Sequence, residues 1–487
     1  MSRPRIDLVE IATQAMIDHG LHPRLPRDAA AELERIDRPA PPAGGELRDL
    51  RALPWVSIDN EESLDLDQLS FAESLPGKGT RILVAIADVD SLVPKGSALD
   101  RHALANTTSV YTPARIFSML PEKLSTDLTS LNPGEDRQAV VVELIVDEDG
   151  ERAGESVFRA LVHNHAKLVY ETVAAWLDDH GNIPDEVARF VPAAEQIRIQ
   201  DAATLALKRL RQQEGALDFE TIEAKAEMSD GDVVAVRRRE QTRAHEIIED
   251  IMIAANGVTA RFLEKKRMPA IRRVVRSPER WDRIARLAEE HGARLPASPD
   301  AEALEEFLLV EKKKDPTTFP DLSLSIIKLM GRGEYVAQKP GSAPEGHFGL
   351  AVRDYAHSTA PNRRYPDLVT QRLLKAAIDG ERSPYTFDEL AAIAEHCSRQ
   401  ENAADKVERL AIKAAAAIHL APRVGERFGG VVTGASSKGT WVRVFDPPVE
   451  GKLVAGEKGL DVGDRVKVKL VGVNPERGFI DFARLGK

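Results

Sequence analysis

The chain has 487 residues, enough for about three domains at roughly 150 residues each. Hydrophobic residues make up 43% and charged residues 30% of it, a composition typical of folded proteins that excludes wholesale disorder. The net charge of −11 argues against a strongly basic nucleic-acid-binding chain. However, ten Lys or Arg between Arg261 and Arg286 form either a local basic surface or an ordinary solvated helix face.

The cysteine content and the hydropathy pattern indicate the compartment. Cys397 is the single cysteine, which excludes an intrachain disulfide framework and predicts a reducing environment. The longest apolar run, Ala139 to Val146, spans eight residues, includes Glu143 and is too short for a membrane helix. The N-terminal residues contain no apolar signal-peptide core. We therefore expect a cytoplasmic protein that makes no contact with a membrane.

The first segment, residues 1–45, is predicted to contain two short helices. Leu8 to His19 has helical periodicity, and Pro26 can occupy the first turn of a second helix that ends near Ile36. The run Arg38 to Gly45 (RPAPPAGG) then breaks the pattern and indicates a linker. We expect a helical cap on the main domain; a helix-turn-helix fragment is the alternative.

Residues 46–420 are predicted to form one large domain. Strand patterns come first and helical patterns dominate later, which favours an α+β fold. The expected strands are Trp55–Ile58, Leu64–Phe71, Arg81–Ala87, Ala139–Val146 and Glu155–Val162. The expected helices include Ala166–Leu177, Ala194–Gln212, Thr242–Lys265 and Phe387–Ala417.

Residues 423–487 are predicted to form a separate small β-barrel. Gly- and Pro-rich turns separate five short strand patterns, which is typical of an OB-fold, a common nucleic-acid-binding form. The expected strands are Phe428–Thr433, Thr440–Phe445, Val449–Leu453, Arg465–Val471 and Phe479–Asp481.

Three aspartates near the second expected strand are candidate metal ligands. In an extended strand, the alternation Leu64-Asp65-Leu66-Asp67 puts Asp65 and Asp67 on one face, about 6.5–7 Å apart, and Asp59 lies just upstream. Converging carboxylates suit Mg²⁺, which can activate water and stabilise a phosphodiester displacement. A solvated acidic edge strand has the same spacing and is the alternative.

Basic and aromatic residues supply candidate contacts to a nucleic acid. In the sequence APNRRYPDL (360–368), Arg363 and Arg364 lie at the start of an expected helix, where backbone N–H groups also favour anions. This pattern predicts a phosphate site, with a plain surface helix start as the alternative. Tyr111 and Tyr170 lie in segments where they either stack on bases or fill the core or surface.

Taken together, these segments resemble the ribonuclease II/ribonuclease R family of processive 3′→5′ exoribonucleases. The resemblance runs in order over roughly residues 48–487. It is carried by SID with Asp65 and Asp67 (57–67), AIADV (85–89), SMLP (118–121), GALDF (215–219), EIIEDIMIAAN (246–256), HFGL (347–350), APNRRYPDL (360–368) and the terminal barrel. It implies an RNA-sized channel in the central domain with Mg²⁺ at its end, Mn²⁺ being the alternative ion.

The resemblance also implies roles for single residues. Asp59, Asp65 and Asp67 match catalytic, metal-binding carboxylates, with Asp67 nearest the chemical step, and Arg363 matches the arginine on the scissile phosphate. Gln68 stands where a fourth metal-binding carboxylate is usual, and a neutral amide is a poorer ligand. The expected RNA contacts are Tyr111, Tyr170, Arg363, Arg364, Asp405, Lys438 and Trp441.

Other departures concern the flanking domains. The usual pair of cold-shock domains does not fit into residues 1–45, and no basic tail follows the barrel, which favours ribonuclease II over ribonuclease R. Lys438 and Lys452 stand where related barrels often have an aromatic residue and a histidine. We therefore expect the affinity of the barrel for RNA to fall as the salt concentration rises.

The sequence therefore predicts a monomeric, Mg²⁺-dependent hydrolytic exoribonuclease that degrades single-stranded RNA to nucleoside 5′-monophosphates, without an obligate protein partner. The alternative is an RNA-binding protein of the same fold whose catalysis is weak or lost because of Gln68. A DNA-directed exonuclease is a weaker alternative.

Overall fold

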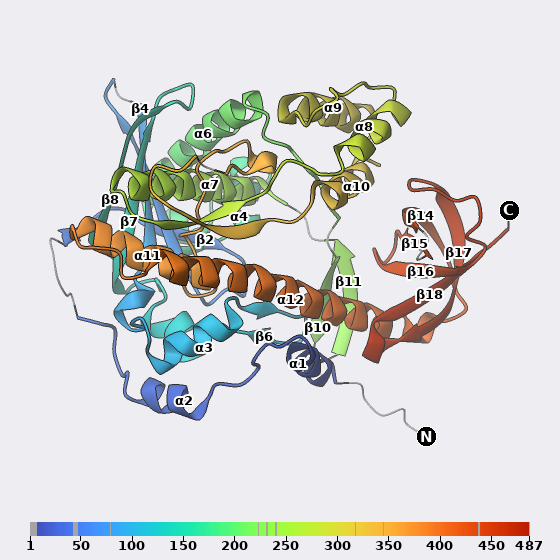
Figure 1. The fold of residues 1–487 in the computed structure, drawn as a ribbon, viewed down its shortest axis with the longest axis horizontal. Helices are drawn as coiled ribbons and strands as arrows, with labels where there is room; N and C mark the ends of the chain where they lie inside the picture. Colours follow the sequence, from blue (N-terminus) through green and yellow to red (C-terminus); the bar gives the residue numbers. More distant parts are fainter. Residues whose placement is uncertain are drawn as a thin grey trace.

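The computed structural model describes residues 7–41, 47–77, 79–222, 224–229, 232–238, 241–316, 318–343, 345–436 and 439–486. A seven-stranded sheet has the order β1-β8-β7-β4-β3-β2-β9, and five C-terminal strands close a barrel in the order β14-β15-β16-β18-β17. The long helix α12 (Phe387–Leu420) runs from the helices around the sheet to the barrel (Figure 1). None of the helices in these ranges is both long and apolar enough to span a bilayer.

The main sheet combines an antiparallel centre with parallel edges. The strands β3, β4, β7 and β8 pair antiparallel, whereas β2 pairs parallel with β9 and β1 pairs parallel with β8. The sheet consists of β1 (Arg48–Asp49), β2 (Val56–Asp59), β3 (Gln68–Leu75), β4 (Gly79–Ala87), β7 (Asp136–Val146), β8 (Arg152–His163) and β9 (Ala166–Val169).

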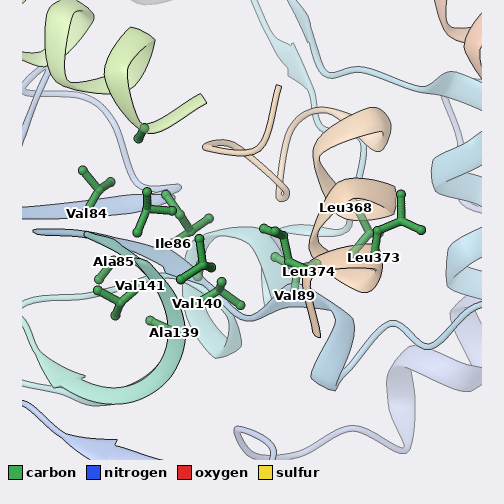
Figure 2. Close-up of a cluster of buried hydrophobic side chains, with 14 of the residues drawn as sticks. Val84, Ala85, Ile86, Val89, Ala139, Val140, Val141, Leu368, Leu373 and Leu374 are labelled. Atoms are coloured by element: carbon green, nitrogen blue, oxygen red, sulfur yellow. The ribbon is translucent and has the colours of Figure 1, made fainter. Parts of the chain in front are cut away.

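The main core lies between the middle of this sheet and the helices packed on it. Strands β4 and β7 are nearly continuous apolar runs, because helices and neighbouring segments bury both of their faces. Figure 2 shows Val84, Ile86 and Val140 of these strands in one cluster with Leu368 and Leu374 of α11 (Tyr365–Ile378). Burial of α11 against this core fixes the helix whose first turn follows the Arg363-Arg364 motif.

The remaining elements surround the sheet or connect it to the barrel. The other helices are α1 (Leu8–Asp18), α2 (Arg27–Glu34), α3 (Ala98–Asn106), α4 (Tyr170–Leu177), α5 (Asp185–Arg189), α6 (Val191–Gln213), α7 (Arg243–Lys265), α8 (Trp281–Glu290), α9 (Ala301–Lys314) and α10 (Phe319–Met330). Three two-stranded antiparallel sheets are formed by β5 (Val110–Tyr111) with β6 (Ile116–Phe117), β10 (Ala224–Ser229) with β11 (Asp232–Arg238), and β12 (Ala270–Val274) with β13 (Glu334–Gln338).

The two N-terminal helices pack on different parts of the main body. Helix α1 contributes Met16 to a cluster with Val110 of β5 and Val407 of α12. Helix α2 contacts α3, and the chain between the two helices is held by His22 N, which donates to Asn106 Oδ1 at 2.8 Å. Helix α1 therefore packs against β5 and α12, and helix α2 packs against α3. The helical cap and its helix-turn-helix alternative stay predictions.

The barrel contains each of the five expected strands. They are β14 (Arg427–Ser436), β15 (Gly439–Val444), β16 (Glu450–Ala455), β17 (Arg465–Asn474) and β18 (Phe479–Arg484). Arg443 of β15 reaches out of the barrel to Asp321 of α10, with Nη2 and Oδ1 2.7 Å apart, and both side chains are buried. This ion pair joins the barrel to the bundle of helices α8 to α10.

Two expected elements are wrong in extent. The strand expected over Leu64–Phe71 begins only at Gln68. Before Gln68, the backbone N–H of Leu66 bonds to a side chain and not to a neighbouring strand, since Leu66 N donates to Ser130 Oγ at 2.9 Å. The helix expected over Ala166–Leu177 is split into β9 and α4, because the first four residues pair with β2.

Candidate active site

Asp67 is the most buried of the candidate carboxylates. Its side chain is 1% exposed, Oδ1 accepts a hydrogen bond from Asn362 N at 2.9 Å, and Oδ2 lies 3.2 Å from Arg363 Nε. Its backbone oxygen accepts from Ala87 N at 2.9 Å, which fixes the residue at the end of β4. Burial raises the pKa of Asp67 to about 7, although the neighbouring Arg363 charge opposes this shift.

Arg363 is the positive charge shared by the candidate carboxylates. It precedes α11, and its backbone oxygen accepts from Ser109 N at 2.9 Å. The side chain is 41% exposed, so part of the guanidinium remains accessible. Although burial opposes the shift, the charges of Asp67, Asp65 and Asp59 raise the pKa of Arg363, which keeps it cationic.

Asp65 and Tyr111 also interact electrostatically with Arg363. Burial raises the pKa of Asp65, and the charge of Arg363 and a hydrogen bond from Tyr111 oppose this shift. The Tyr111 ring is 39% exposed, and burial of its hydroxyl raises its pKa to about 12. Tyr111 N donates to Glu408 Oε1 of α12 at 2.8 Å. Long-range folding therefore brings Asp65, Tyr111 and Arg363 within interaction distance of one another.

Glu408 was missed by the sequence analysis, which selected Asp405 on the same helix. Asp405 is 48% exposed and its carboxylate lies 3.6 Å from Arg332 Nη1. The two acids are three residues apart, close to one helical turn, so spacing alone could not decide which of them reaches the Tyr111 strand.

Asp59 and Gln68 border a cavity of about 340 Å³. Asp59 Oδ1 accepts hydrogen bonds from Asn60 N and Ser63 Oγ, both at 2.7 Å. Gln68 Oε1 is buried and has no hydrogen-bond partner within the described part of the chain. The other predicted residues that line the cavity are Tyr170, Arg363 and Arg364.

The side-chain oxygens of the predicted metal ligands show whether a divalent cation fits this site. Within the described ranges, no group of three or more His, Cys, Asp or Glu is placed to hold a metal ion. In the structure Asp59 Oδ1 accepts a hydrogen bond from Ser63 of its own loop, and Arg363 lies beside Asp67. The convergence of Asp59, Asp65 and Asp67 on one ion therefore stays a prediction. However, Gln68 Oε1 is a buried oxygen that accepts no hydrogen bond in those ranges, and Asp67 Oδ2 is a buried oxygen that is ion-paired with Arg363. Hard oxygen donors of this kind fit Mg²⁺.

Arg364 is held by a structural partner. Its Nε and Nη2 donate to the two oxygens of Asp367 at 2.9 and 2.7 Å, and Asp367 is fully buried. Asp367 Oδ1 also accepts from Ala360 N at 2.9 Å. This fork shapes the loop that carries Arg363 and leaves Arg364 at the cavity wall.

Tyr170 begins α4 and is 9% exposed. Its ring stacks on that of His245 with centroids 3.9 Å apart and planes 15° apart. His245 was missed by the sequence analysis, because the two residues lie on different helices and no local pattern relates them. Both rings line the cavity that contains Asp59 and Gln68.

Trp441, a candidate RNA contact in the barrel, lines neither of the cavities described in this section. Trp441 of β15 is partly buried and is the cross-strand partner of Lys452 of β16. Lys438 lies outside the described residues.

A second cavity of about 340 Å³ adjoins the first, and Glu249 and Leu350 line both. Its wall is mixed in charge, with Lys208 and Arg211 facing acidic residues such as Asp218. Two of the motifs quoted above also line this second cavity. The motif GALDF (215–219) contributes residues that include Phe219, and the motif HFGL (347–350) contributes residues that include His347. The two neighbouring cavities therefore combine a polar wall at Asp59 and Gln68 with a second wall that also contains apolar residues such as Phe219.

Comparison with known proteins gives matches over nearly the whole chain. The RNB domain matches residues 47–380, and the RNase II-type exonuclease C-terminal S1 domain matches residues 426–485. Ribonuclease R of Vibrio parahaemolyticus is 32% identical over 473 residues, which cover 89% of this chain and 55% of that protein. The chain thus spans about half the length of this curated relative.

Two solved structures share the fold. Mycoplasma genitalium RNase R in complex with ribose methylated single-stranded RNA has a TM-score of 0.87 at 22% identity, covering 98% of this chain and 78% of that one. Yeast Ssd1, a pseudonuclease, has a TM-score of 0.72 at 17% identity, covering 94% of this chain and 57% of that one.

Proposed function

Because this chain belongs to the RNB family, we propose that it is a processive 3′→5′ exoribonuclease that hydrolyses single-stranded RNA to nucleoside 5′-monophosphates. The observation that carries the proposal is the pair formed by Asp67 and Arg363 at the start of α11. It combines a buried carboxylate with a partly exposed guanidinium beside a polar cavity, which suits the binding of a phosphodiester.

A divalent cation, proposed as Mg²⁺ with Mn²⁺ as the alternative, would be held by Asp59, Asp65 and Asp67 with the carbonyl oxygen of Gln68. When bound, such an ion supplies an activated water and neutralises charge on the phosphate. The chain's own contribution is to orient the substrate: Asn362 N and Ala87 N fix Asp67, and Ser109 N fixes the backbone of Arg363.

Arg363 is proposed to bind the scissile phosphate. Its fork of N–H donors matches phosphate oxygens, and its charge stabilises the negative charge that develops during displacement. The exposed Tyr111 ring is proposed to stack on a base near the 3′ end, which tolerates every base. Both residues lie on short segments joined by the bridge between Thr108 and Arg364.

The competing function is RNA binding without efficient hydrolysis. Gln68 removes one negative charge from the proposed metal site, and the pseudonuclease Ssd1 has the same fold. The two functions differ in their products. We expect release of nucleoside 5′-monophosphates from a single-stranded RNA oligomer in Mg²⁺, and little release from a DNA oligomer of the same sequence. An intact RNA that still binds the protein would favour the competing function.

The branch of the family, the assembly state and the location are also proposals. The curated relative described above is named ribonuclease R, whereas the barrel matches an RNase II-type domain, so these comparisons do not select one branch. We propose that the protein is a monomer without an obligate protein partner, which light scattering would test. We also propose a cytoplasmic location, with which the buried, reduced Cys397 is consistent.

A further inference from the structure

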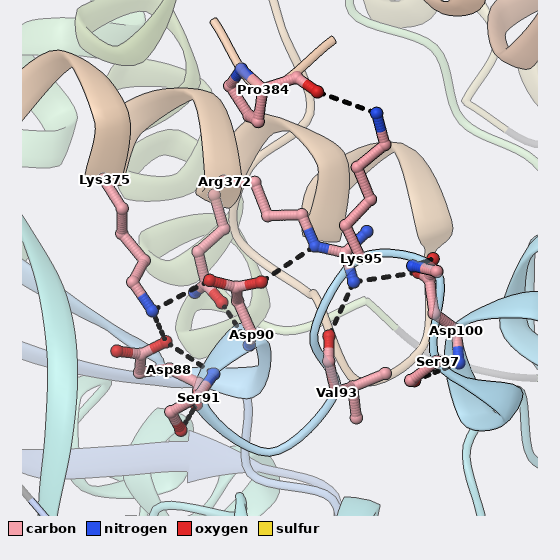
Figure 3. Close-up of polar contacts among 12 residues, drawn as sticks. Asp88, Asp90, Ser91, Val93, Lys95, Ser97, Asp100, Arg372, Lys375 and Pro384 are labelled. Carbon is pink, nitrogen blue, oxygen red and sulfur yellow. Dashed lines mark hydrogen bonds and ion pairs between the residues drawn. The ribbon is translucent and has the colours of Figure 1, made fainter. Parts of the chain in front are cut away.

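We propose that Arg372, which lies two helical turns inside α11, is a positioning residue that sets the placement of Arg363 and Tyr111 through Asp100. This inference rests on the proposed function for its kinetic test. Arg372 itself lies in the buried network of Figure 3 and lines neither of the two cavities.

Arg372 binds three separate pieces of chain at once. Its side chain is 3% exposed; Nε donates to Asp90 Oδ1 at 2.9 Å, and Nη2 donates to Val93 O at 2.6 Å. Nη2 also lies 2.8 Å from Asp100 Oδ1, and Nη1 donates to Tyr385 OH at 2.7 Å. Every nitrogen of the guanidinium is therefore engaged, which a lysine ammonium at the same place could not reproduce.

Asp100 connects this network to the candidate active site. The carboxylate lies on α3 and is buried, and its Oδ1 also accepts from the hydroxyl of Tyr365 at 3.0 Å. Tyr365 is the first residue of α11 and directly follows Arg363 and Arg364. Tyr365 and Arg372 are seven residues apart, so they lie on one face of the helix, about 10 Å apart along its axis. Two anchors on one face fix both the rotation of α11 and its position along the axis.

The same two elements carry the proposed substrate contacts. At the end of α3 the chain continues through Thr107, whose carbonyl accepts from Tyr365 N at 2.8 Å. Ser109 N then donates to Arg363 O at 2.9 Å, and the strand proceeds to Tyr111. A shift of α11 against α3 would therefore move Arg363 relative to both Tyr111 and Asp67.

The network also brings opposite charges together in a mostly buried position. Lys375 lies 2.9 Å from Asp88 Oδ1 and 2.9 Å from Asp90 Oδ2, so two cations of α11 face three carboxylates that follow β4 or lie on α3. Lys375 keeps a positive charge beside Asp88 and Asp90, but Asp100 has its ion pair with Arg372. Loss of the Arg372 guanidinium therefore removes the ion pair that joins α11 to Asp100 of α3.

The test compares Arg372→Lys with Arg81→Lys as a matched control. Arg81 makes two carboxylate contacts, with Glu73 and Glu143, but lies near the opposite end of β4 from Asp88. Two quantities are measured below the unfolding temperature of each variant: the single-turnover cleavage rate in Mg²⁺, and the dissociation constant for the same RNA in EDTA. We expect Arg372→Lys to lower the cleavage rate by at least about tenfold while the dissociation constant changes by less than about threefold. We expect Arg81→Lys to leave both values near those of the wild type.

A second readout needs no activity. The amide protons of Ser109 and Tyr365 make the hydrogen bonds that join the two segments, so their exchange with solvent should accelerate in Arg372→Lys and not in Arg81→Lys. Unchanged exchange, or a cleavage rate within about twofold of the wild type, would overturn the inference. If the wild type itself does not cleave RNA, the proposed function fails, and the exchange result alone decides the inference. If Arg372→Lys does not fold, Asp100→Asn, which keeps the shape and an acceptor for Tyr365, replaces it in both measurements.

Discussion

Arg363 Nε lies 3.2 Å from Asp67 Oδ2, so a guanidinium that is 41% exposed covers a carboxylate that is 1% exposed. Burial disfavours the charged form of this carboxylate, and the neighbouring Arg363 cation opposes that effect. The exposed part of Arg363 is the portion free to meet a substrate phosphate. The pair thus links a buried carboxylate to a guanidinium that solvent can reach.

Arg363→Lys tests whether the site needs the planar shape of the guanidinium or only its positive charge. Lysine keeps the positive charge near Asp67 but cannot form the planar fork, so we expect the single-turnover cleavage rate to fall by roughly 10²-fold. Arg332→Lys, which changes an exposed arginine on the Asp405 side, is the matched control. Normal cleavage by Arg363→Lys would remove Arg363 from the phosphate-binding role.

Gln68→Asp tests whether the amide limits metal binding. The substitution restores a negative charge next to Asp67, so we expect Mg²⁺ to raise the unfolding temperature of the variant at least as much as that of the wild type. In EDTA the added charge should lower the unfolding temperature, because the nearby carboxylates repel it. A smaller Mg²⁺-induced shift in the variant would mean that the amide itself is required.

Glu305 provides a pH-dependent test outside the proposed metal site. It is 2% exposed, its Oε2 accepts from Asp218 N at 2.8 Å, and burial raises its pKa to about 7. The folded state therefore binds this proton more tightly than the unfolded state, and the group costs stability as the pH rises from about 4.5 to about 7. Glu305→Gln should be more stable than the wild type at pH 8, by on the order of 1–2 kcal/mol, with a smaller difference at pH 5. Denaturant unfolding at both pH values measures this, and a pH-independent difference would contradict it.

The buried pair of Arg443 and Asp321 should hold the barrel against α10. Burial raises the pKa of Asp321 and Arg443 opposes the shift, so Arg443→Met leaves an unpaired buried acid. We expect a loss of about 3–5 kcal/mol in unfolding free energy, and faster protease cleavage between α12 and β14. The double variant Arg443→Met/Asp321→Leu should recover part of that loss. Equal stability of the single and double variants would show that the two groups do not depend on each other.

Local periodicity predicted most of the fold but little of the geometry of the site. The strand over residues 81–87 and the helix beginning at Phe387 form where the pattern placed them, because burial on defined faces dictates both. The segment before Gln68 differs because Ser130, far along the chain, binds its backbone. The contacts of Asp67 with Arg363 and of Tyr111 with Glu408 could not be predicted for a similar reason: they depend on the positions of α11 and α12, which strand spacing does not determine.

The most direct test of the proposed function follows a 5′-labelled single-stranded RNA of about 30 nucleotides, longer than the footprint of one OB-fold. The wild type and Asp67→Asn are each incubated with it in Mg²⁺ or in EDTA, and binding is measured in parallel. We predict that the wild type in Mg²⁺ converts the label to one very short product without a ladder, whereas Asp67→Asn binds the RNA and leaves it intact. RNA that stays full-length with the bound wild type, or that is degraded equally well by Asp67→Asn, would contradict the assignment.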